Sequence, residues 1–204
     1  MDNLPLSNAF RDFARQPGSA IAGGLLVAQV INADTDVDWC RAEFARLAGL
    51  IGSAVDARRL IEFLRDQGFA GAQSYYEPNN SSLEHVLRTK RGIPISLALV
   101  VIGVAEELGL RANGVNFPRH FLVAVDDLLA DPFRMAVVES ADRRPGLAQP
   151  ELEEAGGFPS ATSVDIVVRM LNNLRPWAVE PDHPAGALGL LGRQALFLRT
   201  PVPL

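Results

Sequence analysis

The stretch Arg91–Ile102 reads RGIPISLALVVI, and it decides the fold. Pro94 suits the first turn of a helix, because proline lacks the N–H that would stay unpaired there. From Ile95 to Leu108 the segment is apolar on nearly every side. A helix that is hydrophobic all round is usually the buried centre of its domain. The stretch therefore predicts a central buried helix that begins at Pro94.

The pattern changes beyond Gly109, where short apolar runs replace the long one. His120–Val125 and Leu128–Ala130 are separated by Asp126-Asp127, two residues typical of a hairpin turn. With that turn, Val125 lies opposite Leu128. This spacing predicts two antiparallel strands after the central helix.

The segments before and after these elements are predicted to be helical. In the first third, apolar spacing and capping residues predict helices over Leu6–Arg15, Ser19–Asn32, Val37–Ile51 and Asp56–Gln67. Thr162 or Ser163 caps a further helix that ends near Pro176, and a last helix covers Ala185–Leu198. We divide the chain into a helical region at 1–67, a core at 68–160 and C-terminal helices at 161–204.

Composition excludes several classes of function. The net charge of -5 does not favour nucleic acid or an anionic membrane as a partner, since both require a basic surface. A single cysteine excludes an intramolecular disulfide and a cysteine-rich metal site. The first residues lack the basic and apolar regions of a secretory signal. We expect a cytoplasmic location, no metal and no cofactor.

His120 and Asp131 form the pair of residues on which catalysis could depend. If the turn lies at Asp126-Asp127, Leu122 pairs with Asp131, and His120 lies two residues along the same face. Diagonal neighbours of this kind lie roughly 7–8 Å apart at the backbone, within reach of a hydrogen bond from the imidazole to the carboxylate. A register shift of one residue would separate them.

A covalent catalyst also needs a nucleophile, and the start of the central helix is the natural place for it because the helix dipole lowers the pKa of a thiol. The first turn contains Ser96 and no cysteine. Cys40 falls on the apolar stripe of its helix, where free cysteines are commonly buried. The sequence therefore offers Ser96, His120 and Asp131 as the candidate catalytic residues.

A series of short motifs covers roughly residues 68–174, more than half of the chain. They are Tyr75-Tyr76 through Asn80-Ser81, Val86-Leu87-Arg88, Gly92 to Leu97, Leu108-Gly109-Leu110, Gly114 to Pro118, His120-Phe121-Leu122, Asp131-Pro132-Phe133 and Arg169 to Leu174. In order and spacing they resemble the bacterial SirB-one family, a transglutaminase-like domain usually followed by tetratricopeptide-like helices.

The resemblance implies a papain-like α+β fold with a central helix packed on an antiparallel sheet. In active transglutaminase-like enzymes the helix start carries cysteine, and two strands carry histidine and aspartate. His120 and Asp131 match the latter two, whereas the cysteine position falls at about Ile95 or Ser96. The SirB-one family generally lacks this cysteine too. This chain departs further in having Arg119 where the family usually has glycine, and in ending within the repeat region.

Three functions remain open. The first is a non-catalytic module that binds a peptide or protein in the old active-site groove, with Tyr76, Asn80, Asn116 and Arg119 as candidate binding residues. The second is a hydrolase or acyltransferase that uses Ser96, His120 and Asp131, in which an asparagine amide could stabilise an oxyanion. The third is a scaffold that recruits a partner through its C-terminal helices. Because the cysteine is missing, we favour the first.

Overall fold

The computed structural model describes residues 4–52, 55–74, 77–117, 120–138 and 160–178. In chain order the elements are α1 (Leu4–Arg15), α2 (Ala20–Ile31), α3 (Val37–Ile51), α4 (Ala57–Asp66), β1 (Ala70–Gly71), η1 (Pro78–Ser81), α5 (Leu83–Thr89), β2 (Arg91–Gly92), α6 (Pro94–Glu107), β3 (Ala112–Phe117), β4 (His120–Val125), β5 (Leu128–Asp131), β6 (Ala136–Val137) and α8 (Ser163–Ala178). Among these described residues, no helix combines the length and apolarity required to cross a membrane.

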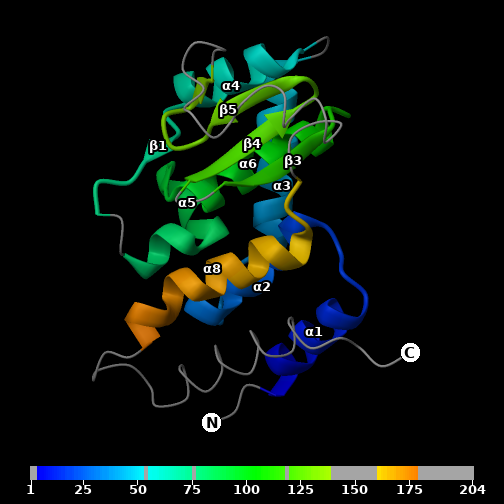
Figure 1. Cartoon of the computed structure of the whole chain (residues 1–204), viewed down its shortest axis with the longest axis vertical. Coiled ribbons are helices and arrows are strands. Elements are labelled where there is room, and N and C mark those ends of the chain that lie inside the picture. Colours follow the sequence, from blue (N-terminus) through cyan, green and yellow to red (C-terminus); the bar gives the residue numbers. More distant parts are fainter. Residues whose placement is uncertain (1–3, 53–54, 75–76, 118–119, 139–159, 179–204) are drawn as a thin grey trace.

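Helix α6 is the centre of the molecule. Every residue from Ile95 to Ala105 is buried, as expected for a helix that is apolar all round. The four-stranded antiparallel sheet covers one side of α6, and α2 and α3 pack against other sides. Figure 1 shows the sheet and α4 in the upper part of the molecule, with α2 and α8 side by side below them.

The sheet has the order β3-β4-β5-β6, and its register agrees with the predicted hairpin. Val125 pairs with Leu128, and Asp126 adopts a φ of 48° in the turn between them. Asp126 also accepts a hydrogen bond of 3.2 Å from the backbone N–H of Arg111, which ties the turn to the start of β3. The prediction that Asp126-Asp127 forms the turn is therefore confirmed.

The two faces of the sheet have different surroundings. Phe121, Val123 and Val125 belong to the main core around α6. Leu122 and Ala124 belong to a second, smaller apolar cluster on the opposite face. Because side chains alternate along a strand, β4 has an inner face toward α6 and an outer face away from it.

Helix α8, near the C-terminal end of the described residues, begins beside the sheet. Ser160 forms a bridge with Val115, and the N–H of Ala161 donates to the carbonyl of Gly114 at 2.7 Å. These contacts place the start of α8 beside β3, and its buried side packs on α2.

The mixed helical and antiparallel-sheet architecture agrees with the predicted class, and the helix boundaries differ from the predicted ones by a few residues. Four strands, β1, β2, β3 and β6, were not predicted, because Gly114 and Asn116 interrupt the apolar pattern of β3 and each of the other three has only two residues. Helix α8 ends near Pro176 as predicted, two residues beyond it at Ala178. The division at 67 and 160 stays a prediction, and Ala185–Leu198 lies outside the described residues.

Candidate functional site

The hydroxyl of Ser96, in the first turn of α6, is engaged on all sides. The Ser96 side chain is fully buried, and its Oγ accepts a hydrogen bond of 3.1 Å from the N–H of Ile93. The Oγ lies 2.6 Å from the carbonyl oxygen of Asn80 and 3.1 Å from that of Ile93. Its single proton can serve only one carbonyl at a time, and Asn80 is the nearer. This serine holds the start of α6 to the η1 segment.

Tight packing around Ser96 explains the glycine at position 92. A Cβ atom on Gly92 would lie 2.7 Å from Ser96 Oγ and 2.9 Å from a methyl group of Val86. A side chain at this position would therefore force α5 and α6 to shift apart. The serine and the glycine form one structural unit, in which the Ser96 hydroxyl is bonded to the backbone.

His120 and Ser96 lie on different sides of the sheet. His120 begins β4 and is exposed, and alternation puts it on the outer face with Leu122. Ser96 lies on α6, which packs against the inner face. A general base must come within about 2.6–3.2 Å of the hydroxyl that it activates. The structure thus does not bring this candidate base and nucleophile together.

Asp131 shares the outer face with His120 but has other partners. One of its carboxylate oxygens, Oδ1, accepts hydrogen bonds from the N–H groups of Phe133, at 2.9 Å, and Arg134, at 3.2 Å. Among the described residues, no hydrogen bond or ion pair joins His120 to Asp131. The carboxylate thus stabilises the turn after β5, which is a common role for aspartate.

The candidate binding residues are also placed by local structure. The side chain of Asn80 is buried, and its amide donates a 2.6 Å hydrogen bond to the carbonyl of Ser74. Asn116, at the end of β3, accepts a hydrogen bond from Arg169 of α8. The same guanidinium donates to the carbonyl of His120 at 3.3 Å and lies 5.5 Å from the ring centroid of Phe121.

Arg169 therefore fastens α8 to the β3–β4 hairpin, a role that the sequence reasoning did not assign to it. The other two candidates, Tyr76 and Arg119, lie outside the described residues.

The only thiol of the chain is a core residue, as predicted. Cys40 is fully buried in α3. Burial, and to a lesser extent the nearby carboxylate of Glu84, raises the pKa of Cys40 to about 12. A thiol with this pKa is not a thiolate near neutral pH, so Cys40 does not replace the missing nucleophile.

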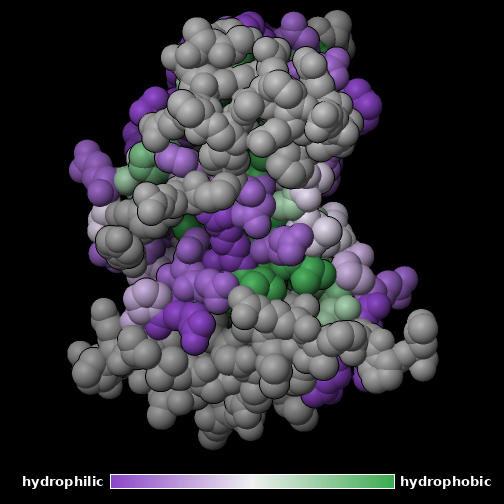
Figure 2. Space-filling model, viewed as in Figure 1, coloured by the Kyte–Doolittle hydropathy of each residue, from purple (hydrophilic) through white to green (hydrophobic). Residues whose placement is uncertain are grey.

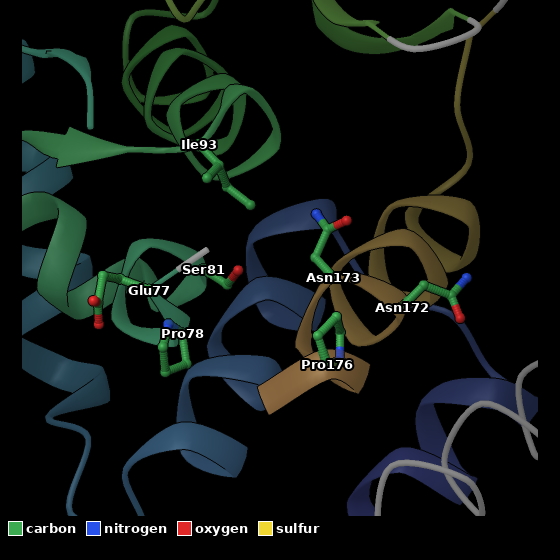
Figure 3. Close-up of a pocket in the computed structure, with 7 residues that line it drawn as sticks. All are labelled: Glu77, Pro78, Ser81, Ile93, Asn172, Asn173 and Pro176. Carbon is green, nitrogen blue, oxygen red and sulfur yellow. The ribbon is translucent and has the colours of Figure 1, made fainter. Parts of the chain in front are cut away.

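A pocket of about 130 Å³ lies beside the start of α6, where η1 approaches the last turns of α8. Its apolar walls are Pro78, Ile93 and Pro176, and Figure 3 shows them around the opening. Its polar residues are Glu77, Ser81, Asn172 and Asn173. Figure 2 shows hydrophilic side chains gathered across the middle of the face seen there, at the level of α5 and α8.

Ser81 and Asn173 were not among the residues predicted to bind. The only signal for them in the sequence was that both lie within the short motifs that resemble the SirB-one family. No local pattern brings η1 and α8 together, because about 90 residues separate them.

The chain is similar to a known protein family and to several bacterial proteins. A profile of the family described as the transglutaminase-like superfamily matches residues 33–172. A UPF0162 protein of Xylella fastidiosa (strain 9a5c) is 38% identical over 199 residues, which cover 84% of this chain and 69% of that protein. A UPF0162 protein of Pseudomonas aeruginosa is 31% identical over 161 residues, covering 72% of this chain and 60% of that protein.

A shorter match reaches a eukaryotic protein. F-box only protein 21 of Homo sapiens is 43% identical over 74 residues, which cover 36% of this chain and 12% of that protein. The chain also matches UPF0162 proteins of Vibrio cholerae and of Xylella fastidiosa (strain Temecula1), and the matches span 43% and 46% of their lengths. No solved structure matches the chain.

Proposed function

The chain belongs to the transglutaminase-like superfamily, and from this premise we propose that it is a non-catalytic member that binds a peptide or protein segment at the start of α6. The observation that carries the proposal is the state of Ser96. Its hydroxyl is buried and bonded to the backbone of Ile93 and Asn80, so it is not available to attack an acyl group.

The chemistry of the superfamily's cysteine supports the same view. A thiolate at a helix start is a nucleophile with a lowered pKa, whereas a serine depends wholly on an adjacent base. His120, the candidate base, lies on the outer face of the sheet and α6 on the inner face. Function is a property of the site rather than of the fold, and a pocket beside a serine whose hydroxyl is bonded supports binding more than catalysis.

The proposal includes the finer predictions made from the sequence. The SirB-one type, the papain-like arrangement, the tetratricopeptide-like tail and the cytoplasmic location remain parts of it. The relatives named UPF0162 carry no activity in their names, so the proposal for this chain rests on its own residues.

Labelling with a fluorophosphonate probe tests the absence of serine catalysis. We expect the intact chain to show no more labelling than the Ser96→Ala variant, because the hydroxyl is bonded and buried. Labelling of the intact chain that disappears in Ser96→Ala would restore the hydrolase alternative. A denatured sample of the intact chain serves as the control for non-specific reaction.

Panning a random peptide library on the immobilised full chain tests the binding function. We expect enriched peptides whose binding, followed by NMR of the ¹⁵N-labelled chain, shifts signals of η1 and of the start of α6. No enrichment above a blank matrix would reject the binding function. Shifts confined to α1 and α4 would reject its location.

A further inference from the structure

Ser81 differs from every other buried serine near α6 in having a free hydroxyl. The residue is 3% exposed, and its Oγ has no hydrogen-bond partner among the described residues. Leaving a buried polar group unpaired costs about 1–3 kcal/mol, so such groups call for an explanation. In Figure 3 the hydroxyl points into the pocket, toward the space in front of Asn173.

The other residues that line the pocket carry almost no charge. Glu77 is its only charged lining residue among those described, and Figure 3 shows the Glu77 carboxylate turned away from the opening. Among the lining residues that the structure describes, none is an arginine, a lysine or an aromatic residue. This described lining offers a phosphate no cation, a nucleobase no stacking partner and an ammonium group no buried acid.

The pocket also offers two kinds of neutral hydrogen-bonding group. The hydroxyl of Ser81 can donate and accept, and the carboxamide of Asn173 has a separate donor and acceptor. Asn173 is exposed, and it too has no partner within the described part of the chain. A peptide group is complementary to this pair, since it carries one N–H and one carbonyl.

The apolar walls and the size indicate what flanks that peptide group. Pro78, Ile93 and Pro176 present aliphatic surfaces that suit a small aliphatic side chain. The volume of about 130 Å³ is well above the roughly 10–15 Å³ that one water requires by the same measure. The pocket is therefore large enough for more than a single bridging water.

We propose that this pocket, built by Ser81, Asn173 and the walls from η1, α6 and α8, binds a backbone peptide group of an extended polypeptide next to a small aliphatic side chain. The inference deepens the proposed binding function and rests on it. It names the ligand class as a neutral polypeptide segment recognised through its main chain.

The first test measures thermal stability. Replacing a serine by alanine should lower Tm where the hydroxyl has a structural partner, but not where the hydroxyl has none. Ser81→Ala should leave Tm unchanged or raise it, since the variant removes an unpaired buried group. The adjacent Ser82 is equally buried, and it accepts a hydrogen bond from the N–H of His85 at the start of α5. As a matched control, Ser82→Ala should lower Tm by about 2–4 °C.

A fall in Tm for Ser81→Ala as large as that for Ser82→Ala would mean that the hydroxyl has a structural partner in solution. That result would overturn the inference. It would leave the proposed binding function in place, because a library could still yield peptides that bind elsewhere near α6.

The second test titrates the ¹⁵N-labelled full chain with N-acetyl-valine N-methylamide, which contains two peptide groups and one small aliphatic side chain. We expect saturable shifts at Ser81, Ile93 and Asn173. Ser81→Ala and Asn173→Ala should each weaken binding about five- to tenfold, as for the loss of one hydrogen bond. Equal or stronger shifts at these residues with phosphate or methylammonium would overturn the assignment of a peptide ligand.

Asn172→Ala is the control for the second test, because the Asn172 side chain points away from the opening in Figure 3. Its affinity for the amide probe should match that of the unaltered chain. If library peptides bind and neither Ser81→Ala nor Asn173→Ala weakens them, this inference fails while the proposed function stands. If no peptide binds at all, both fail.

Discussion

Two serines near the start of α6 have contrasting surroundings. Ser96, within α6, is fully buried and exchanges hydrogen bonds with two backbone segments. Ser81, at the end of η1, is nearly as buried but has no partner among the described residues. Ser96, the candidate nucleophile, is thus structural, while the hydroxyl of Ser81, one segment away, bonds to no residue that the structure describes. Burial alone does not distinguish the two, and only the hydrogen-bond partners do.

The contrast has a chemical meaning. A nucleophilic hydroxyl must be free to approach the substrate, whereas a structural hydroxyl must stay bonded to its partners. In this chain the Ser96 hydroxyl joins α6 to η1, and η1 in turn carries Ser81 to the edge of the pocket. The contact that bonds the Ser96 hydroxyl thus also sets the place of Ser81 at the pocket.

The largest effect is expected for Ser96→Ala. The variant removes the hydroxyl that bonds the N–H of Ile93 and the carbonyl of Asn80, and leaves these buried groups only their longer hydrogen bond of 3.4 Å to each other. We expect it to reduce the free energy of unfolding by about 2–4 kcal/mol. Urea unfolding followed by circular dichroism measures the change. A loss below that of Ser82→Ala would contradict the structural role of Ser96.

A somewhat smaller loss is expected for Gly92→Ala. The added methyl group would approach Ser96 Oγ to 2.7 Å and a Val86 methyl group to 2.9 Å, so α5 and α6 must separate slightly. Overpacking of this kind typically costs about 1–3 kcal/mol. The same unfolding assay measures it, with Gly49→Ala as the control because a Cβ at Gly49 meets no atom within 4 Å. Equal stability of the two variants would argue against close packing at Ser96.

A double-mutant cycle on His120 and Asp131 should show little coupling. Asp131→Ala removes two turn hydrogen bonds and should cost about 1 kcal/mol, whereas His120→Ala alters an exposed side chain. Since no hydrogen bond joins the two side chains, the effects should add within about 0.5 kcal/mol. A larger interaction energy would show that the pair still acts as a unit.

The smallest effect concerns His85, whose backbone N–H donates to Ser82. Burial lowers the pKa of the His85 imidazole in the folded chain. The unfolded chain therefore binds a proton more readily, so this contribution to stability is present above the ordinary pKa of about 6.5 and is lost as pH falls through the folded-state pKa. Unfolding measured between pH 5 and 8 should show a shallow decline toward acid, and His85→Gln should flatten it. An unchanged slope in that variant would assign the decline to other groups.

The sequence by itself determined the central helix and the hairpin. The all-round apolar run after Pro94 permits only burial, and the Asp126-Asp127 turn between two apolar runs sets the register of β4 and β5. It also determined that the start of α6 has no thiol, and that Cys40 belongs to the core. These features depend on local periodicity and on residue chemistry, which a sequence carries directly.

Only the tertiary structure decided which candidate residues meet. Alternation along the paired strands β4 and β5 placed His120 and Asp131 on one face, but the side of the sheet that α6 covers depends on packing between distant segments. The free hydroxyl of Ser81 and its neighbour Asn173 come together because α8 folds back beside η1, about 90 residues away in the chain. Whether a serine is free or bonded depends on such long-range contacts, and no local pattern encodes them.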